Sequence, residues 1–207
     1  MYKRQAYAWA AFPFTLYALN TNSNDALAAL LVLIALLVAS SPPARGAAAA
    51  AAGMAKFAPA ALAPVLATYG LPGRPWRDQL GRLLLFAGTF LIVAVVLLGL
   101  WVDDLRLFWD RTLAFQADRD APFSVWGLWD LHGLQRVVQA GGVILALALA
   151  VVPRRQDLAG LAALCAAVLI GLQLGVGYWF YLYLVWFFPL VMLAVLAPRP
   201  PLRSSTS

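Results

Sequence analysis

Charged residues, cysteine and histidine are scarce in this sequence. Only 12% of the 207 residues are charged, while 63% are hydrophobic and the mean hydropathy is +0.80. Soluble domains carry about 25% charged residues, so the composition excludes an ordinary soluble domain and indicates a polytopic membrane protein. The single cysteine, Cys165, excludes an intrachain disulfide and, inside an apolar run, is expected to pack as a small apolar residue. No spacing typical of a metal site accompanies the single histidine, His132.

The net charge of +6 comes from Lys and Arg residues in the short breaks between apolar runs. In a soluble protein this charge would suggest a nucleic-acid partner. In a membrane protein it follows from the positive-inside rule, which places basic loops in the cytoplasm. We therefore expect the lipid bilayer as a partner and no nucleic acid.

One long polar interval, residues 103–135, interrupts the apolar blocks. It contains six of the nine acidic residues, three arginines and the only histidine, so it is net acidic by 3, whereas the rest of the chain has twelve basic residues and three acidic ones. This charge asymmetry predicts that the interval is a long extracytoplasmic loop.

The first apolar run resembles a signal peptide but has no small-residue cleavage pattern, and we predict a membrane helix over residues 6–19. The first five residues look unlike the rest, so we expect the true start to lie upstream and the chain to be a C-terminal fragment. Further helices are predicted over residues 25–40, 83–102, 136–152, 158–175 and 178–197, with the polar turn NTNSND at residues 20–25.

Residues 47–69 leave two arrangements open. The apolar pieces that end at Phe57 and Tyr69 are each about 16 Å long as helices, too short to span a bilayer alone. They form either one Pro-kinked span or a re-entrant hairpin with Lys56 and Pro59 near its tip. We prefer the hairpin because it places Arg45 in the cytoplasm and residues 20–25 on the same side as residues 103–135.

The basic segment 70–82 is the best cytoplasmic loop and orients the remaining spans. Residues 153–157 are then cytoplasmic as well, and residues 198–207 form a basic, Pro-rich, disordered cytoplasmic tail. The sequence thus predicts an all-α polytopic transmembrane helix bundle, a single domain over residues 1–197 with about six to eight membrane segments, in a bacterial cytoplasmic membrane.

Several polar residues could bind substrate. Lys56 lies in an apolar block, where an ionisable side chain is either functional or extends to the membrane interface. The interval 103–135 combines arginines that could hold phosphate, carboxylates and the tryptophans of an aromatic belt. Asp103 and Asp104 could bind a divalent cation together with phosphate, although a solvated helix end is the favoured explanation of the pair. The candidate substrate-binding residues are Asn22, Asn24, Lys56, Arg111, Arg119, Asp120, Ser124, Trp126 and His132.

Four stretches resemble a known family: NTNSNDALAALL, GMAKFAPAALAPVLATYG, FWDRTLAFQADRDAPFSVWGLW and GYWFYLYLVWFFPLVMLAVL. Together they resemble the C-terminal half of bacterial integral-membrane glycosyltransferases of the GT-C superfamily, in the mannosyltransferase-like family 87. The Lys-x-x-Pro block at Lys56 and the Asn-Asp helix start at Asp25 recur across that superfamily, and the run RTLAFQADRDAPFS is more distinctive.

This resemblance implies inverting transfer of a mannose-type hexose from a polyprenyl-phosphate donor to an extracytoplasmic glycan, lipid or protein acceptor. It implies that Asp25, the candidate catalytic residue here, faces the active site. The superfamily's principal catalytic acid lies in the first extracytoplasmic loop, which this chain does not contain, so we expect the base outside the chain and the chain alone to be inactive. On this hypothesis Arg111 and Arg119 hold phosphate and Trp126 stacks on the sugar. The rival hypotheses are a transporter or flippase of a lipid-linked sugar and a non-catalytic membrane assembly subunit.

Overall fold

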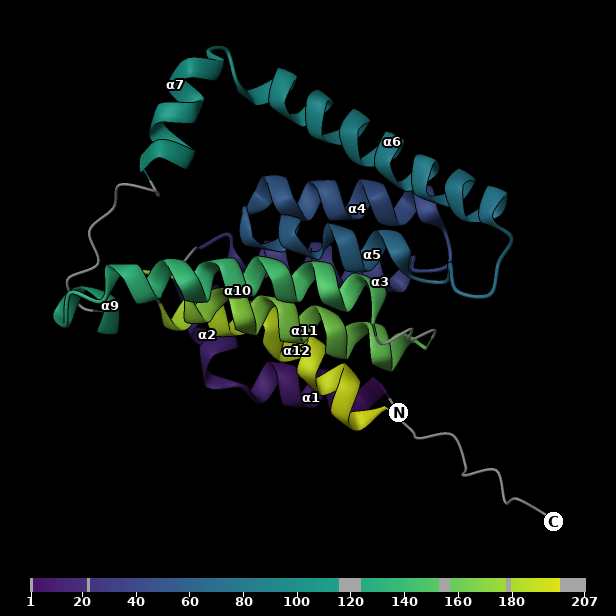
Figure 1. The fold of residues 1–207 in the computed structure, drawn as a ribbon. Helices are drawn as coiled ribbons and strands as arrows, with labels where there is room; N and C mark the ends of the chain where they lie inside the picture. Colours follow the sequence, from purple (N-terminus) through teal and green to yellow (C-terminus); the bar gives the residue numbers. More distant parts are fainter. Residues whose placement is uncertain (1, 22, 116–123, 153–156, 178–179, 198–207) are drawn as a thin grey trace.

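The computed structural model describes residues 2–21, 23–115, 124–152, 157–177 and 180–197, and the described residues form helices and no strand (Figure 1). The α-helices are α1 (Tyr2–Ala11), α2 (Pro13–Asn20), α3 (Asp25–Leu37), α4 (Pro42–Ala55), α5 (Ala63–Thr68), α6 (Trp76–Trp101), α7 (Leu105–Trp109), α9 (Val125–Leu128), α10 (His132–Val151), α11 (Leu158–Leu174) and α12 (Leu184–Leu196). Short 3-10 helices η1 (Ala58–Leu62) and η3 (Tyr181–Tyr183) and a π-helical turn η2 (Asp110–Ala114) complete the order. The predicted tail, residues 198–207, lies outside the described residues.

The predicted single helix over residues 6–19 is instead two helices. Pro13 has no backbone N–H and therefore starts α2, where the first N–H needs no partner, while Phe12 before it is extended. Phe12 stacks on Phe188 of α12 with 3.7 Å between ring centroids, which fixes this break against the bundle. The prediction was wrong here because it followed the apolar pattern and not the proline.

Helix α4 and the η1–α5 segment form the predicted hairpin. A guanidinium N–H of Arg45 at the start of α4 donates to the carbonyl of Tyr69, just after α5, at 3.3 Å. A methyl group on Gly53 would come within 2.9 Å of the Ala60 Cβ, so the two arms pack tightly. Figure 1 shows α4 and α5 side by side, with Lys56 in the connection between them. These contacts exclude the alternative of one kinked span.

Helices α3, α4, α11 and α12, with the hairpin arm η1–α5, enclose the core. Small side chains let them approach closely, and the core includes Ala49, Leu62, Val168 and Leu190. Cys165 is also fully buried in this core, as its apolar surroundings predict. The core therefore lies among these elements, and the longest apolar helices, α6 and α10, pack on its outside.

Two helices, α6 and α10, are long and apolar enough to cross a membrane, with 26 and 20 residues. In the most apolar 18-residue stretch of each helix, only 6% and 11% of the residues are buried within the protein, so their outer faces are available to lipid. A third span results if α2 and α3, which meet at an angle of 119°, are counted together. The structure thus shows an all-helical membrane protein with two to three candidate spans, fewer than the predicted six to eight.

The interval 103–135 is not one continuous loop. It contains α7, η2 and α9, and α10 begins at His132 and not after residue 135. The Asp104 carboxylate accepts hydrogen bonds from the backbone N–H groups of Arg106 and Leu107 at 2.8 and 3.1 Å and so caps α7. Residues 105–114 therefore form the helical segment that the spacing of their aromatic and charged side chains favours.

The bundle has two chemically different ends. One end, which we call the polar end, holds the α2–α3 turn, Lys56, α7, α9 and η3; the other, the basic end, holds Arg45, residues 69–82 and the ends of α10 and α12 (Figure 1). The polar turn and the described part of the interval 103–135 therefore lie at the same end, as the hairpin arrangement predicts.

Candidate functional site

The carboxylate of Asp25 at the start of α3 is the centre of a buried polar cluster at the polar end. Asp25 is only 1% exposed, yet its two oxygens accept hydrogen bonds from two groups: the indole N–H of Trp186 at 2.7 Å and the hydroxyl of Ser23 at 2.5 Å. The ammonium Nζ of Lys56 lies 3.2 Å from the same oxygen that Trp186 contacts. These partners compensate a charge that would otherwise be costly to bury.

Three separate elements bring this cluster together. Ser23 and Asp25 come from the α2–α3 turn, Lys56 ends α4 with an extended backbone, and Trp186 lies in the first turn of α12. The side-chain amide of Asn24 donates to the carbonyl of Ala55 at 3.1 Å and joins the start of α3 to the end of α4. The predicted residues Asn24, Asp25 and Lys56 are thus neighbours in space.

Lys56 presents the positive charge of the cluster outward. Its side chain is 29% exposed, whereas that of Asp25 is 2% exposed, so a ligand at the surface meets the ammonium and not the carboxylate. Nζ also lies 5.8 Å from the centre of the Trp186 ring, in the range of a cation–π interaction. The geometry fits a lysine held in place to bind an anion, with Asp25 as its positioning residue.

A pocket of about 600 Å³ lies beside the cluster, between α9, the end of α11 and the start of α12. Ser124, Trp126, Gln173 and Phe187 are among its lining residues. The Gln173 amide donates to the carbonyl of Tyr183 at 3.0 Å, and the Tyr183 ring stacks on Trp186 with 4.4 Å between centroids. The pocket and the Asp25 cluster therefore share one wall, the first turns of α12.

Ser124 and Trp126 have different positions at this pocket. The Ser124 hydroxyl accepts from the backbone N–H of Gly127 at 3.1 Å and caps α9, so its local role is structural. Trp126 is half-buried and lines the pocket, where its ring offers an apolar face to a ligand. Mostly apolar walls with a few polar groups are typical of small-molecule sites.

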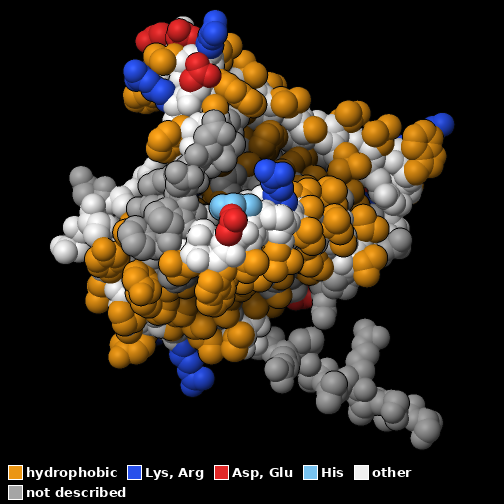
Figure 2. Space-filling model, turned by 60° about the vertical axis from the view of Figure 1, so that its left-hand side comes forward, with side chains coloured by type: hydrophobic (Ala, Val, Ile, Leu, Met, Phe, Trp, Pro, Cys, Tyr) orange, Lys and Arg blue, Asp and Glu red, His pale blue; other side chains and the backbone are white. Residues whose placement is uncertain are grey.

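Arg111 lies on η2, at the end of the arm formed by α6 and α7. It is exposed, forms no ion pair with another described residue, and lines a second pocket of about 310 Å³ together with Asp103 and Phe108. Figure 2 shows charged side chains gathered at the tip of this arm and a hollow with hydrophobic walls between the arm and the body. An edge-to-face contact of Phe108 with Phe57, 6.5 Å between centroids, joins the arm to the hairpin tip next to Lys56.

His132 is not part of the cluster. It begins α10, is largely exposed, and its Nε2 lies 3.3 Å from a carboxylate oxygen of Asp130, which is even more exposed. Asn22, Arg119 and Asp120 lie outside the described residues. Among the residues that are described, no group of three or more His, Cys, Asp or Glu side chains could hold a metal ion.

Sequence reasoning did not identify two members of the cluster, Trp186 and Ser23. One signal could have pointed to Trp186: a buried indole N–H needs an acceptor, and Asp25 is an acid at the start of an apolar helix. Ser23 donates and accepts within its own turn, since its oxygen also accepts from the Asp25 N–H at 3.2 Å.

Comparison of the chain with protein-family models, with curated protein sequences and with solved structures finds no match.

Proposed function

We propose that the chain is part of a membrane glycosyltransferase that moves a hexose from a polyprenyl-phosphate donor to an extracytoplasmic acceptor in a bacterial cytoplasmic membrane. The observation that carries the proposal is the buried Asp25 carboxylate that holds the partly exposed Lys56 ammonium at the polar end, 3.2 Å away. The resemblance of four stretches to GT-C enzymes supports the same reaction class. Beyond α6 and α10, the proposal requires α11, α12, the α2–α3 pair and the α4–α5 hairpin to lie within the bilayer. This gives six segments if the bent pair and the hairpin each count once, and eight if each counts twice.

Lys56 is the proposed phosphate-binding residue. Transfer forms a bond between the acceptor oxygen and the anomeric carbon and breaks the bond from that carbon to the phosphate oxygen, which keeps the electron pair. The leaving polyprenyl phosphate thereby gains a negative charge, and a cation already fixed in position stabilises that charge in the transition state. Arg111 and Arg119 would share the phosphate, and no divalent cation is required for this role.

Asp25 does not fit the role of general base. Its carboxylate is almost fully buried and already has three donors, so it offers no free oxygen to an acceptor hydroxyl. We assign Asp25 a positioning role and place the base on another segment, in agreement with the loop position that the resemblance implies. Trp126 in the 600 Å³ pocket stacks on the sugar ring in this proposal.

A donor-binding experiment with Lys56→Met tests the proposal without depending on the identity of the general base. The full chain in detergent is titrated with polyprenyl monophosphate mannose, with sugar-free polyprenyl monophosphate and with neutral polyprenol, and binding is followed by native mass spectrometry. We expect Lys56→Met to weaken both phosphate ligands roughly tenfold and to leave polyprenol unchanged. Lys56→Arg should keep most of the affinity.

The matched control is Lys3→Met, which removes the only other lysine, on α1. Equal binding by Lys56→Met and Lys3→Met would reject Lys56 as the phosphate ligand. Reconstituted vesicles then separate transfer from translocation: movement of the lipid-linked sugar between leaflets without a glycosylated product would favour a flippase. Donor binding with neither activity, even with a companion protein that supplies a base, would favour an assembly subunit.

A further inference from the structure

A second group of cationic side chains lies at the basic end, opposite the Asp25 cluster. Three arginines from three segments, Arg45 of α4, Arg74 of the loop after α5 and Arg82 of α6, line a pocket of about 370 Å³. Asp78 is the one carboxylate within ion-pair distance of them among the described residues, and a single oxygen of it meets Arg74 at 3.1 Å and Arg82 at 3.3 Å. The pocket therefore has an excess of positive charge.

Arg45 is the unusual member of this group because it is buried. It is 2% exposed, and its guanidinium donates to the backbone carbonyls of Ala39 and Tyr69 while lying 5.5 and 5.9 Å from the rings of Tyr69 and Phe86. The buried Nε atom has no hydrogen-bond partner in the described part of the protein. Carbonyls and ring faces compensate a guanidinium only in part, so an anion in the pocket would complete its environment.

The tyrosine in this pocket does not supply that anion. Burial, together with the nearby Asp157 carboxylate, raises the pKa of Tyr69. A raised pKa keeps the phenol of Tyr69 protonated and neutral at neutral pH. The positive excess of the three arginines therefore persists under physiological conditions.

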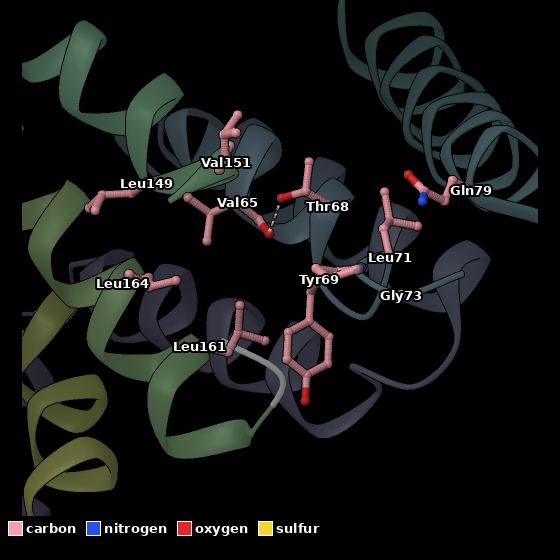
Figure 3. A pocket seen from close by; sticks show the side chains of 12 residues that line it. Val65, Thr68, Tyr69, Leu71, Gly73, Gln79, Leu149, Val151, Leu161 and Leu164 are labelled. Atoms are coloured by element: carbon pink, nitrogen blue, oxygen red, sulfur yellow. Dashed lines mark hydrogen bonds between the residues drawn. The ribbon is translucent and has the colours of Figure 1, made fainter. Parts of the chain in front are cut away.

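An apolar pocket of about 200 Å³ adjoins the basic one, and the two share Tyr69, Pro72 and Gly73. Figure 3 shows Val65, Leu149, Leu161 and Leu164, from α5, α10 and α11, around the apolar pocket. A site that is cationic on one side of a short loop and apolar on the other matches an amphiphile that has a phosphate head and a hydrocarbon chain.

We propose that the pocket lined by Arg45, Arg74 and Arg82 binds the phosphate headgroup of an anionic membrane lipid, whose acyl chain enters the adjoining apolar pocket. A lipid is favoured over free phosphate because the two pockets share the lining residues Tyr69, Pro72 and Gly73, and because the positive-inside rule places this end at the cytoplasmic leaflet, which is rich in anionic lipid. The site is independent of the proposed glycosyl transfer, which uses the opposite end.

Thermal unfolding of the full chain in a neutral detergent tests the site with phosphatidic acid, phosphatidylcholine and inorganic phosphate as probes. We expect phosphatidic acid to raise the unfolding midpoint in a saturable way, and phosphatidylcholine and inorganic phosphate to leave it unchanged. Equal stabilisation by inorganic phosphate would overturn the assignment to a lipid, and no stabilisation by phosphatidic acid would overturn the site.

Arg82→Gln and its control Arg77→Gln distinguish a built site from a basic surface. Arg77 is exposed in the first turn of α6, five residues before Arg82, stacks on Trp76 at 5.5 Å and does not line the pocket. Arg82→Gln should weaken phosphatidic acid roughly tenfold, whereas Arg77→Gln should change it by less than about twofold. An equal loss in both variants would show general attraction to basic residues and overturn the proposal. Arg82 is chosen over Arg45 because its side chain is 29% exposed, whereas Arg45 is buried.

Discussion

Asp25 links three segments that are far apart in the chain, and its charge decides how strongly they are held together. Asn in its place keeps an oxygen to accept from the Trp186 indole but removes the negative charge opposite Lys56. We expect Asp25→Asn to lower the free energy of unfolding by about 1–3 kcal/mol, since Lys56 is partly exposed and can recover some hydration. Denaturant unfolding of the full chain in detergent, followed by tryptophan fluorescence, measures the change.

Asp78→Asn is the matched control for Asp25→Asn. Asp78 also pairs with basic side chains, Arg74 and Arg82, but its side chain is 43% exposed. Exposed pairs contribute about 0–1 kcal/mol, so this substitution should cost less than Asp25→Asn. Similar losses in the two variants would mean that the buried cluster does not hold the polar end together. Adding Lys56→Met to Asp25→Asn should restore part of the stability, because the uncompensated charge is then gone.

The sequence predicted two members of this cluster, Asp25 and Lys56, but not their pairing. Lys56 stands out because an ionisable group in an apolar block is costly and seldom without a role, and Asp25 stands out because it opens an apolar helix directly after a polar turn. Their pairing depends on how the α4–α5 hairpin packs against the start of α3, and no local sequence pattern predicts this packing. Arg111 and Trp126 also stand out by residue type, yet they line two different pockets, so their joint action on one ligand remains a prediction.

At the scale of elements, the packing of α6 against α4 depends on one glycine. A methyl group at Gly46 would lie 2.3 Å from the carbonyl oxygen of Phe86 and 2.5 Å from the hydroxyl oxygen of Thr89. The Phe86 carbonyl oxygen belongs to the backbone and cannot rotate away as a side chain can, so Gly46→Ala forces the two helices apart. We expect a loss of about 1–3 kcal/mol in unfolding free energy, measured by the same denaturant titration.

Gly88→Ala, on α6 itself, separates this clash from the general effect of replacing glycine in a helix. A methyl group at Gly88 would meet nothing within 4 Å. Alanine favours a helix over glycine by about 1 kcal/mol, so Gly88→Ala should leave the protein equally stable or more stable. If Gly46→Ala behaved in the same way, α6 would not pack on α4 as the structure has it.

Proline and charge patterns explain which elements the sequence predicted. The hairpin follows from the short lengths of its apolar arms, and the ends of α11 follow from the acidic cap at Asp157 and the glycine after Leu174. The break at Pro13 was missed because the apolar run continues through it. Within residues 103–135, the helical segment 105–114 follows from the three- and four-residue spacing of its aromatic and charged side chains, whereas α9 was missed because the residues that predict a loop also occur on an exposed helix.

Over the whole molecule, the alternation of polar and basic breaks along the chain becomes a separation in space. The longer helices carry the chain from one end of the bundle to the other, so breaks of one kind collect at one end (Figure 1). Sequence patterns predicted this separation because the positive-inside rule assigns each break between helices to one side of the membrane by its basic residues. They did not predict how far the α6–α7 arm stands from the body, since that depends on the packing of α6 alone.

This separation predicts the sidedness of single cysteines. The native Cys165 is fully buried and is replaced by alanine for the experiment. Asn24→Cys and Asp103→Cys, both exposed at the polar end, should react with a membrane-impermeant maleimide from the same side of sealed vesicles, and Arg77→Cys, exposed at the basic end, only from the other. Labelling of intact and of detergent-opened vesicles, read by gel shift, measures each side.

The position of Asp103 makes this labelling decisive for the candidate site. Asn24 contacts the hairpin tip directly, whereas Asp103 reaches the same end only because α6 crosses the whole bundle from Trp76 to Trp101. If Asn24→Cys and Asp103→Cys reacted from opposite sides, α6 would not span, and Arg111 could not approach a phosphate held at Lys56. If they reacted from one side while Arg77→Cys reacted there too, the bundle would lie along the membrane and its two ends would share one compartment. A lipid-linked donor can meet Lys56 from the extracytoplasmic leaflet only if Asn24→Cys and Asp103→Cys react from one side and Arg77→Cys reacts from the other.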